Sequence, residues 1–172
     1  ILAIASYETA GGKSKNIIPI AASLELIHTY SLIHDDLPAM DNDDFRRNKP
    51  TSHMVFGEAV AILAGDALLT EAFGIIANTT AKPEILIKII NELTHACGTR
   101  GMVGGQTADI IFEDRKIKEK DLFYIHTHKT GALIRASVLT GAIMAEAAPD
   151  TLSALSKYGE KIGLAFQIIE DI

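Results

Sequence analysis

The densest group of charged side chains lies between His34 and Arg47. Two arginines, Arg46 and Arg47, follow five aspartates, which are Asp35, Asp36, Asp41, Asp43 and Asp44. Carboxylates this close repel one another, so we expect a divalent cation to neutralise them, because hard cations take oxygen ligands. Guanidinium groups match the geometry of phosphate and carboxylate. The pattern predicts a cation site beside a phosphorylated substrate; the alternative is a solvated acidic loop.

A calcium-binding loop of the EF-hand type is excluded as the explanation of this stretch. That loop requires an oxygen ligand at its fifth position and glycine at its sixth. Counted from Asp41, these positions hold Phe45 and Arg46. The acidic stretch is therefore not a loop of this type.

The composition describes an aliphatic chain. Its 172 residues are 48% hydrophobic but only 6% aromatic, so we expect one domain with an alanine-rich core. The net charge of -6 argues against nucleic acid as a partner. No uninterrupted apolar run reaches the roughly 18 residues of a membrane span, so we expect no such span. The single cysteine, Cys97, excludes an internal disulfide and fits a reducing compartment, from which we expect a cytoplasmic location.

Apolar residues recur at helical spacing along the whole chain, and no strand pattern is present. Short polar segments with glycine or proline separate the helices, which favours an antiparallel all-α bundle. Helical patterns run up to Ile1 and Ile172, so we expect residues 1–172 to be one domain that is incomplete at both ends. The predicted helices cover residues 1–9, 21–36, 58–77, 83–97, 119–128, 132–147 and 151–172.

The helix that leads into the acids places Leu24, His28, Ser31 and Asp35 on one stripe. His28 is therefore either a core histidine or a phosphate contact, and both readings stay open. His34 lies about 100° round the helix from Asp35 and is interpreted as structural. Pro38 ends the helix, and the turn after it must bring Asp41 back toward Asp35.

Three further groups are candidates for the same site. Gln106 and Asp109 lie one turn apart and are expected to face a cavity. Lys129 and Thr130 precede Gly131, where a helix break exposes N–H groups to a diphosphate; the alternative is an ordinary helix joint. A second acidic pair, Glu170 and Asp171, stands at the end of the chain.

Taken together, these motifs resemble the trans-isoprenyl diphosphate synthases, the polyprenyl synthetase family. Residues 24–41 are similar to the family's first aspartate-rich motif in its DDxxxxD form. The remaining motifs follow in the family's order along the whole chain: Arg46-Arg47, Gly65-Asp66, Gly104-Gly105-Gln106, Lys129-Thr130-Gly131 and Phe166-Gln167.

The resemblance implies an isoprenoid-synthase bundle around a central cavity and a role for each matching residue. Asp35, Asp36 and Asp41 resemble ligands of Mg²⁺, and Glu170 and Asp171 resemble the start of the second acidic motif. Arg46, Lys129, Thr130 and Gln167 resemble contacts of an allylic diphosphate, and Arg47 and His28 resemble contacts of isopentenyl diphosphate. Asp35, Asp36, Asp41, Arg46 and Lys129 form the group expected to carry the reaction. The resemblance also implies a homodimer.

The implied reaction is the condensation of isopentenyl diphosphate with dimethylallyl or geranyl diphosphate. In the family, the positions four and five before the first aspartate set product length, and here they are Ser31 and Tyr30. The aromatic Tyr30 resembles farnesyl-producing enzymes, while its place on the helix is read as the shoulder of the Asp35 stripe. The alternatives are a geranylgeranyl diphosphate synthase and, because Glu170 replaces the usual aspartate, a non-catalytic partner subunit.

Overall fold

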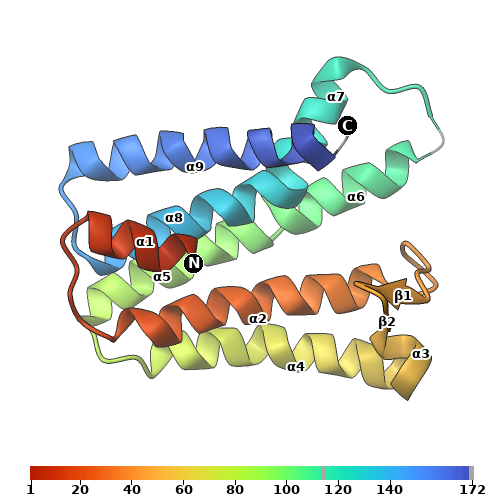
Figure 1. Cartoon of the computed structure of the whole chain (residues 1–172), viewed down its shortest axis with the longest axis horizontal. Coiled ribbons are helices and arrows are strands. Elements are labelled where there is room, and N and C mark those ends of the chain that lie inside the picture. The colour runs from red at the N-terminus through yellow and green to blue at the C-terminus, as the bar shows by residue number, and fades with distance from the viewer. Residues whose placement is uncertain (114, 171–172) are drawn as a thin grey trace. The chain divides into compact units, whose positions relative to one another are not determined.

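The structure is a computed structural model that describes residues 1–113 and 115–170, without the side chain of Glu170. Its internal contacts divide the chain into two compact units, Ile1–Ala21 with Thr79–Ile172, and Ala22–Asn78. Helices make up almost all of the regular structure in both units, which confirms the predicted all-α class (Figure 1).

The first unit is built around α8 (Ala132–Met144). This helix packs against α1 (Leu2–Thr9), α5 (Pro83–Cys97) and α9 (Pro149–Glu170), and α8 and α9 run side by side in Figure 1. The remaining helical elements of the unit are α6 (Met102–Phe112), α7 (Glu119–Ile125) and a π-helical segment, η1 (His126–Gly131). The α5 bounds equal the predicted ones, and Pro83 occupies its first turn as expected.

Small residues allow the helices of this unit to touch backbone to backbone. A side chain at Gly141 on α8 would collide with the carbonyl oxygen of Ala3 on α1. On α9, a Cβ at Gly163 would stand 2.9 Å from the Cα of Gly131. Because dispersion contacts are lost steeply with distance, such close approach compensates for the scarcity of large aromatic side chains in the core.

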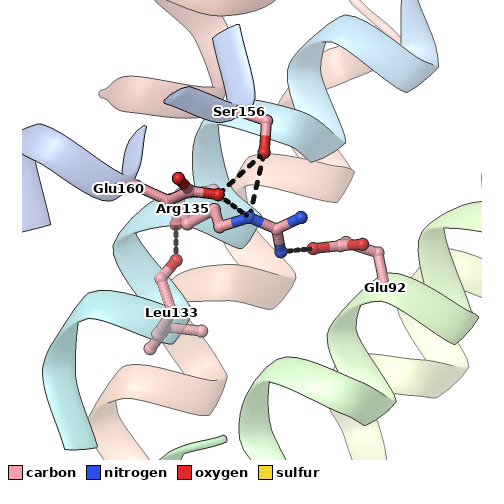
Figure 2. A network of polar contacts seen from close by, with 6 residues as sticks. Glu92, Leu133, Arg135, Ser156 and Glu160 are labelled. Carbon is pink, nitrogen blue, oxygen red and sulfur yellow. Dashed lines mark hydrogen bonds and ion pairs between the residues drawn. The ribbon is translucent and has the colours of Figure 1, made fainter. Parts of the chain in front are cut away.

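An arginine on α8 links the helices on either side of it (Figure 2). Arg135 Nη1 donates to Glu92 Oε1 on α5 at 2.9 Å, and its Nε donates to Ser156 Oγ on α9 at 3.0 Å. The same Nε lies 3.2 Å from Glu160 Oε1. Partly exposed ion pairs stabilise only weakly one by one, but this network joins three helices at one level.

The second unit contains most of α2 (Ile17–Asp35), α3 (Ser52–Phe56) and α4 (Glu58–Ala77), with a hairpin of β1 (Phe45–Arg46) and β2 (Lys49–Pro50). The predicted bounds of α4 are confirmed, and α2 begins four residues before the predicted start at 21. The prediction of no strand was wrong at the hairpin. Its two turn residues, Arg47 and Asn48, have φ of 52° and 61°, the left-handed geometry of a two-residue hairpin turn, which asparagine tolerates well.

Within the described residues, α2 and α4 are long and apolar enough to cross a membrane, as judged by length and composition. One or two such helices are weak support for a membrane protein, because core helices of soluble proteins pass the same test. The expectation of no membrane span therefore stays a prediction.

Two glycines near the ends of their helices should respond oppositely to replacement by alanine. Gly141→Ala forces a Cβ against the α1 backbone and should lower the free energy of unfolding by about 1–3 kcal/mol. Gly74→Ala on α4 meets nothing closer than 3.9 Å and should raise it by up to about 1 kcal/mol through helix propensity. Thermal and urea unfolding followed by circular dichroism measures both, and equal destabilisation by the two variants would contradict the close packing of α1 on α8.

Candidate active site

The turn after α2 returns the acidic stretch to the end of the helix. The backbone N–H of Asp41 donates to the carbonyl oxygen of Asp35 at 2.8 Å, and that of Asp43 donates to Asp36 at 3.2 Å. Asn42 takes a left-handed φ of 53°, which reverses the chain between them. The predicted return of Asp41 toward Asp35 is thus confirmed for the backbone, and it brings these two carboxylate-bearing residues to one end of α2.

Asp36 and Arg46 are already paired with each other. Asp36 is buried, with 3% of its surface exposed, and its Oδ1 accepts hydrogen bonds from Nε and Nη2 of Arg46, both at 2.7 Å. The hydrogen bond to Asp36 raises the pKa of the Arg46 guanidinium above its ordinary value, against a smaller opposing effect of burial. Of the three predicted metal ligands in this stretch, Asp35 is half-buried and Asp41 is exposed, so solvent and ligands can reach both of them.

The loop that carries Arg46 is anchored to α3. Thr51 Oγ1 donates to the carbonyl oxygen of Asp43 at 2.8 Å and lies 3.1 Å from His53 Nδ1. His53 is buried, and its contact with the Thr51 hydroxyl gives the buried ring the hydrogen-bond partner that such a group needs. Arg47 lies exposed at the tip of the hairpin.

The stripe below Asp35 is ordered within α2. Ser31 Oγ donates to the carbonyl oxygen of His28 at 2.9 Å, and both residues are half-buried. Tyr30 is buried, and its ring meets that of His34 edge to face, with centroids 5.7 Å apart. Tyr30 is therefore turned toward His34 and does not share the Asp35 stripe, since five helical residues rotate by about 140°.

In the first unit, the π-helical segment η1 presents Lys129. Its Nζ donates to Asp109 Oδ2 on α6 at 2.6 Å, and a Cβ at Gly105 on α6 would collide with the backbone N of Lys129. Such wide turns inside helices are frequent at functional sites. The predicted helix break at residues 129–131 is thus a π segment, and Gly105 lets α6 approach it.

Other predicted residues lie on elements that pack against η1. Thr130 belongs to η1 itself, and Gln167 lies on α9; both are half-buried. Gln106 Nε2 is buried and has no hydrogen-bond partner within the described part of the chain. A buried donor left without a partner is costly, so an anionic ligand at this point would satisfy it. Glu170 is the last residue of α9; its side chain and Asp171 lie outside the described residues.

The acids suit a cation that is bound together with its substrate. Among the described residues, no three His, Cys, Asp or Glu side chains converge on a ready-made metal site. Mg²⁺ is commonly held by only one or two carboxylates with water and substrate phosphates completing its octahedron. Asp35 and Asp41 supply the all-oxygen ligands that such an ion needs, so the donor set fits Mg²⁺.

A family model described as "Polyprenyl synthetase" matches residues 1–172. The chain belongs to the polyprenyl synthetase family. The geranylgeranyl diphosphate synthase of Cyanophora paradoxa is 50% identical over 100% of this chain and 58% of its own. The farnesyl diphosphate synthase of Bacillus subtilis is 46% identical over 100% of this chain and 59% of its own. This polyprenyl synthetase chain therefore spans between half and two thirds of the length of these curated relatives.

Solved structures agree with this membership. An FPP/GFPP synthase from Zymomonas mobilis superposes with a TM-score of 0.95 at 39% identity, covering 99% of this chain and 63% of that one. A geranyltransferase from Helicobacter pylori, complexed with magnesium and isoprenyl diphosphate, has a TM-score of 0.87 at 40% identity over 91% of this chain and 52% of its own. The isoprenoid-synthase architecture predicted for this polyprenyl synthetase is therefore confirmed.

The Asp36–Arg46 pair should be energetically coupled. Arg46→Gln leaves a buried carboxylate without its partner, so we expect it to lower the free energy of unfolding. The side chain of Arg46 is 33% exposed, and solvent screening should keep this loss to about 1–3 kcal/mol. Adding Asp36→Asn should recover much of that loss in a double-mutant cycle measured by urea unfolding.

Arg47→Gln is the matched control for this cycle, because the neighbouring arginine is exposed on the hairpin turn. It should change the free energy of unfolding by no more than about 0.5 kcal/mol. Equal effects of the two arginine variants would show that the pair with Asp36 contributes nothing.

Proposed function

We propose that the protein is a Mg²⁺-dependent prenyltransferase that condenses isopentenyl diphosphate with dimethylallyl or geranyl diphosphate to give farnesyl diphosphate. The observation that supports this best is the return of Asp41 to Asp35 at the end of α2, beside an arginine oriented by Asp36. This arrangement places two accessible carboxylates, which can bind a cation, beside an oriented guanidinium group, which can bind a diphosphate. The Helicobacter pylori structure is a complex with magnesium and isoprenyl diphosphate, which supports Mg²⁺ and a prenyl diphosphate as the ligands proposed here.

Different residues are assigned different roles in binding the departing diphosphate. Asp35 and Asp41 would hold Mg²⁺, which supplies charge neutralisation to the diphosphate when bound. Asp36 is buried and paired, so we assign it the orientation of Arg46, in place of the direct metal contact that the resemblance implies. Arg46 would add positive charge where negative charge develops, and charge stabilised in this way favours cleavage of the allylic C–O bond. The family resemblance assigns Lys129 a contact with the same kind of diphosphate.

The reaction balances without any further reagent. The electron pair of the breaking C–O bond leaves with the diphosphate, and the alkene of isopentenyl diphosphate forms the new C–C bond to the allylic cation. The resulting cation loses a proton to the departing diphosphate, which restores a double bond. Water would intercept the cation, so the aliphatic composition of the chain suits the step.

Farnesyl diphosphate is proposed as the product because Tyr30 offers a buried aromatic ring one and a half turns below Asp35. A geranylgeranyl product is the alternative, since relatives of both names match at similar identity. A non-catalytic partner subunit is the third possibility, and the intact Asp35, Asp36 and Asp41 count against it. We also propose a cytoplasmic location, supported by the single, buried Cys97.

Turnover by the full-length protein tests the proposal. With isopentenyl and geranyl diphosphates and Mg²⁺, we expect farnesyl diphosphate, detected by chromatography, and no product after chelation of the metal. Asp35→Asn and Asp41→Asn should each lower kcat on the order of 10²–10³-fold, as removal of one group that stabilises developing charge does. The control Asp150→Asn, an exposed aspartate in the first turn of α9, should keep full activity. Absence of turnover in the unaltered protein would favour the partner-subunit reading.

We further propose that the protein forms a homodimer through α3 and α4. Large apolar side chains stand exposed along these helices, which a single chain rarely leaves to water; they are Met54, Val55, Phe56, Val60, Ile62 and Leu63. A second copy is the occupant that the family resemblance supports, and a two-fold axis would set the same surface against itself.

Light scattering after size exclusion tests the dimer. The unaltered protein should have twice the mass of one chain, and Leu63→Glu should give a monomer, because it places two like charges in an apolar interface. Leu63 is 66% exposed; Tyr158→Glu on α9, where the side chain is 52% exposed, is the matched control and should stay dimeric. A dimeric Leu63→Glu variant would exclude this surface.

A further inference from the structure

His34 immediately precedes the first metal-binding acid, and no step of the proposed reaction uses it. Its ring leaves α2 and reaches α4, where Nε2 lies 3.0 Å from the carbonyl oxygen of Ile62. A carbonyl only accepts, so Nε2 is the nitrogen that carries the proton. This contact defines the tautomer and the orientation of the imidazole.

The position of the ring on α4 depends on Gly65. A Cβ at Gly65 would collide with Nε2 and Cδ2 of His34, and would stand 2.8 Å from its Cε1. The imidazole therefore lies directly on the backbone of α4, in the space that any other residue at this position would fill.

The His34 ring also contacts Tyr30, one turn earlier on α2. The two planes meet at 84° with centroids 5.7 Å apart, an edge-to-face arrangement that is favourable for aromatic rings. Tyr30 is 7% exposed. A ring at residue i+4 of a helix stands over the side chain at residue i, so the immobilised imidazole restricts the rotamers open to Tyr30.

We propose that His34 is a positioning residue for product length: held on α4 by Ile62 and Gly65, it fixes the Tyr30 ring that stops the growing prenyl chain. This inference rests on the proposed function and on Tyr30 as the stop. Without the imidazole, the Tyr30 ring gains rotational freedom and yields to a longer chain. The effect reaches the product through Tyr30 alone, so His34 touches neither substrate nor metal.

The readout is the ratio of twenty-carbon to fifteen-carbon product made by the full-length protein from isopentenyl and geranyl diphosphates. His34→Ala should raise this ratio about tenfold, and Gly65→Ala should raise it too, because it displaces the imidazole from the α4 side. His34→Phe keeps a ring and His34→Gln keeps a donor for Ile62, so each should raise the ratio less than His34→Ala. Glu71→Gln, at an exposed position on α4, is the control and should leave the ratio unchanged.

Double variants of His34 and Tyr30 test whether His34 affects the product ratio through Tyr30. Tyr30→Ala should lengthen the product by itself, and adding His34→Ala to it should change the ratio no further, since residues that act through one another are not additive. Thermal unfolding of each variant separates loss of stability from loss of positioning. Gly65→Ala supplies an independent test if His34→Ala fails to fold.

Two outcomes would overturn the inference while the proposed function stands. In one, His34→Ala and Gly65→Ala lower total turnover but leave the product ratio unchanged. In the other, His34→Ala shifts the ratio equally with and without Tyr30. A protein that makes no prenyl product in any variant would instead reject the proposed function, and the inference with it.

Discussion

Helices of this chain approach one another closely at points where glycine removes the side chain that would separate them. In the first unit, α8 meets the backbone of α1 at Gly141, and α6 meets η1 at Gly105. In the second unit, Gly65 admits the imidazole of His34 onto α4. A core with few aromatic residues gains its dispersion contacts from many such close approaches, and the elements that bear the candidate site residues are placed by them.

Two of the predicted diphosphate contacts, one in each unit, are held by partners before any ligand arrives. Arg46 is paired with the buried Asp36, and Lys129 is paired with Asp109. Each pair orients a long side chain that would otherwise sample many rotamers, so less conformational entropy remains to be lost when an anion binds. Of the three acids predicted to bind the metal in this stretch, Asp35 and Asp41 are left accessible, and a cation shared with a diphosphate would neutralise them.

Membership in the polyprenyl synthetase family narrows the activity without choosing the product, since relatives named for farnesyl and for geranylgeranyl diphosphate match the whole chain. The difference between those products is a difference in the depth of a site. In the proposed function, the Tyr30 ring and the contacts that hold it would set this depth, and the acids above it would bind the diphosphate through a cation.

The sequence alone determined the helical class, the bounds of α4 and α5, and the return of Asp41 toward Asp35, because helical periodicity, proline and glycine act over a few residues. The two-residue hairpin was not predicted from the sequence, because Arg47 and Asn48 adopt left-handed geometry without the glycine that usually marks such a turn. Only the tertiary structure decided that Asp36 pairs with Arg46, that His53 is buried, and that Tyr30 faces His34. These outcomes depend on contacts between different elements or on the direction of a side chain, and neither leaves a periodic signal in the sequence.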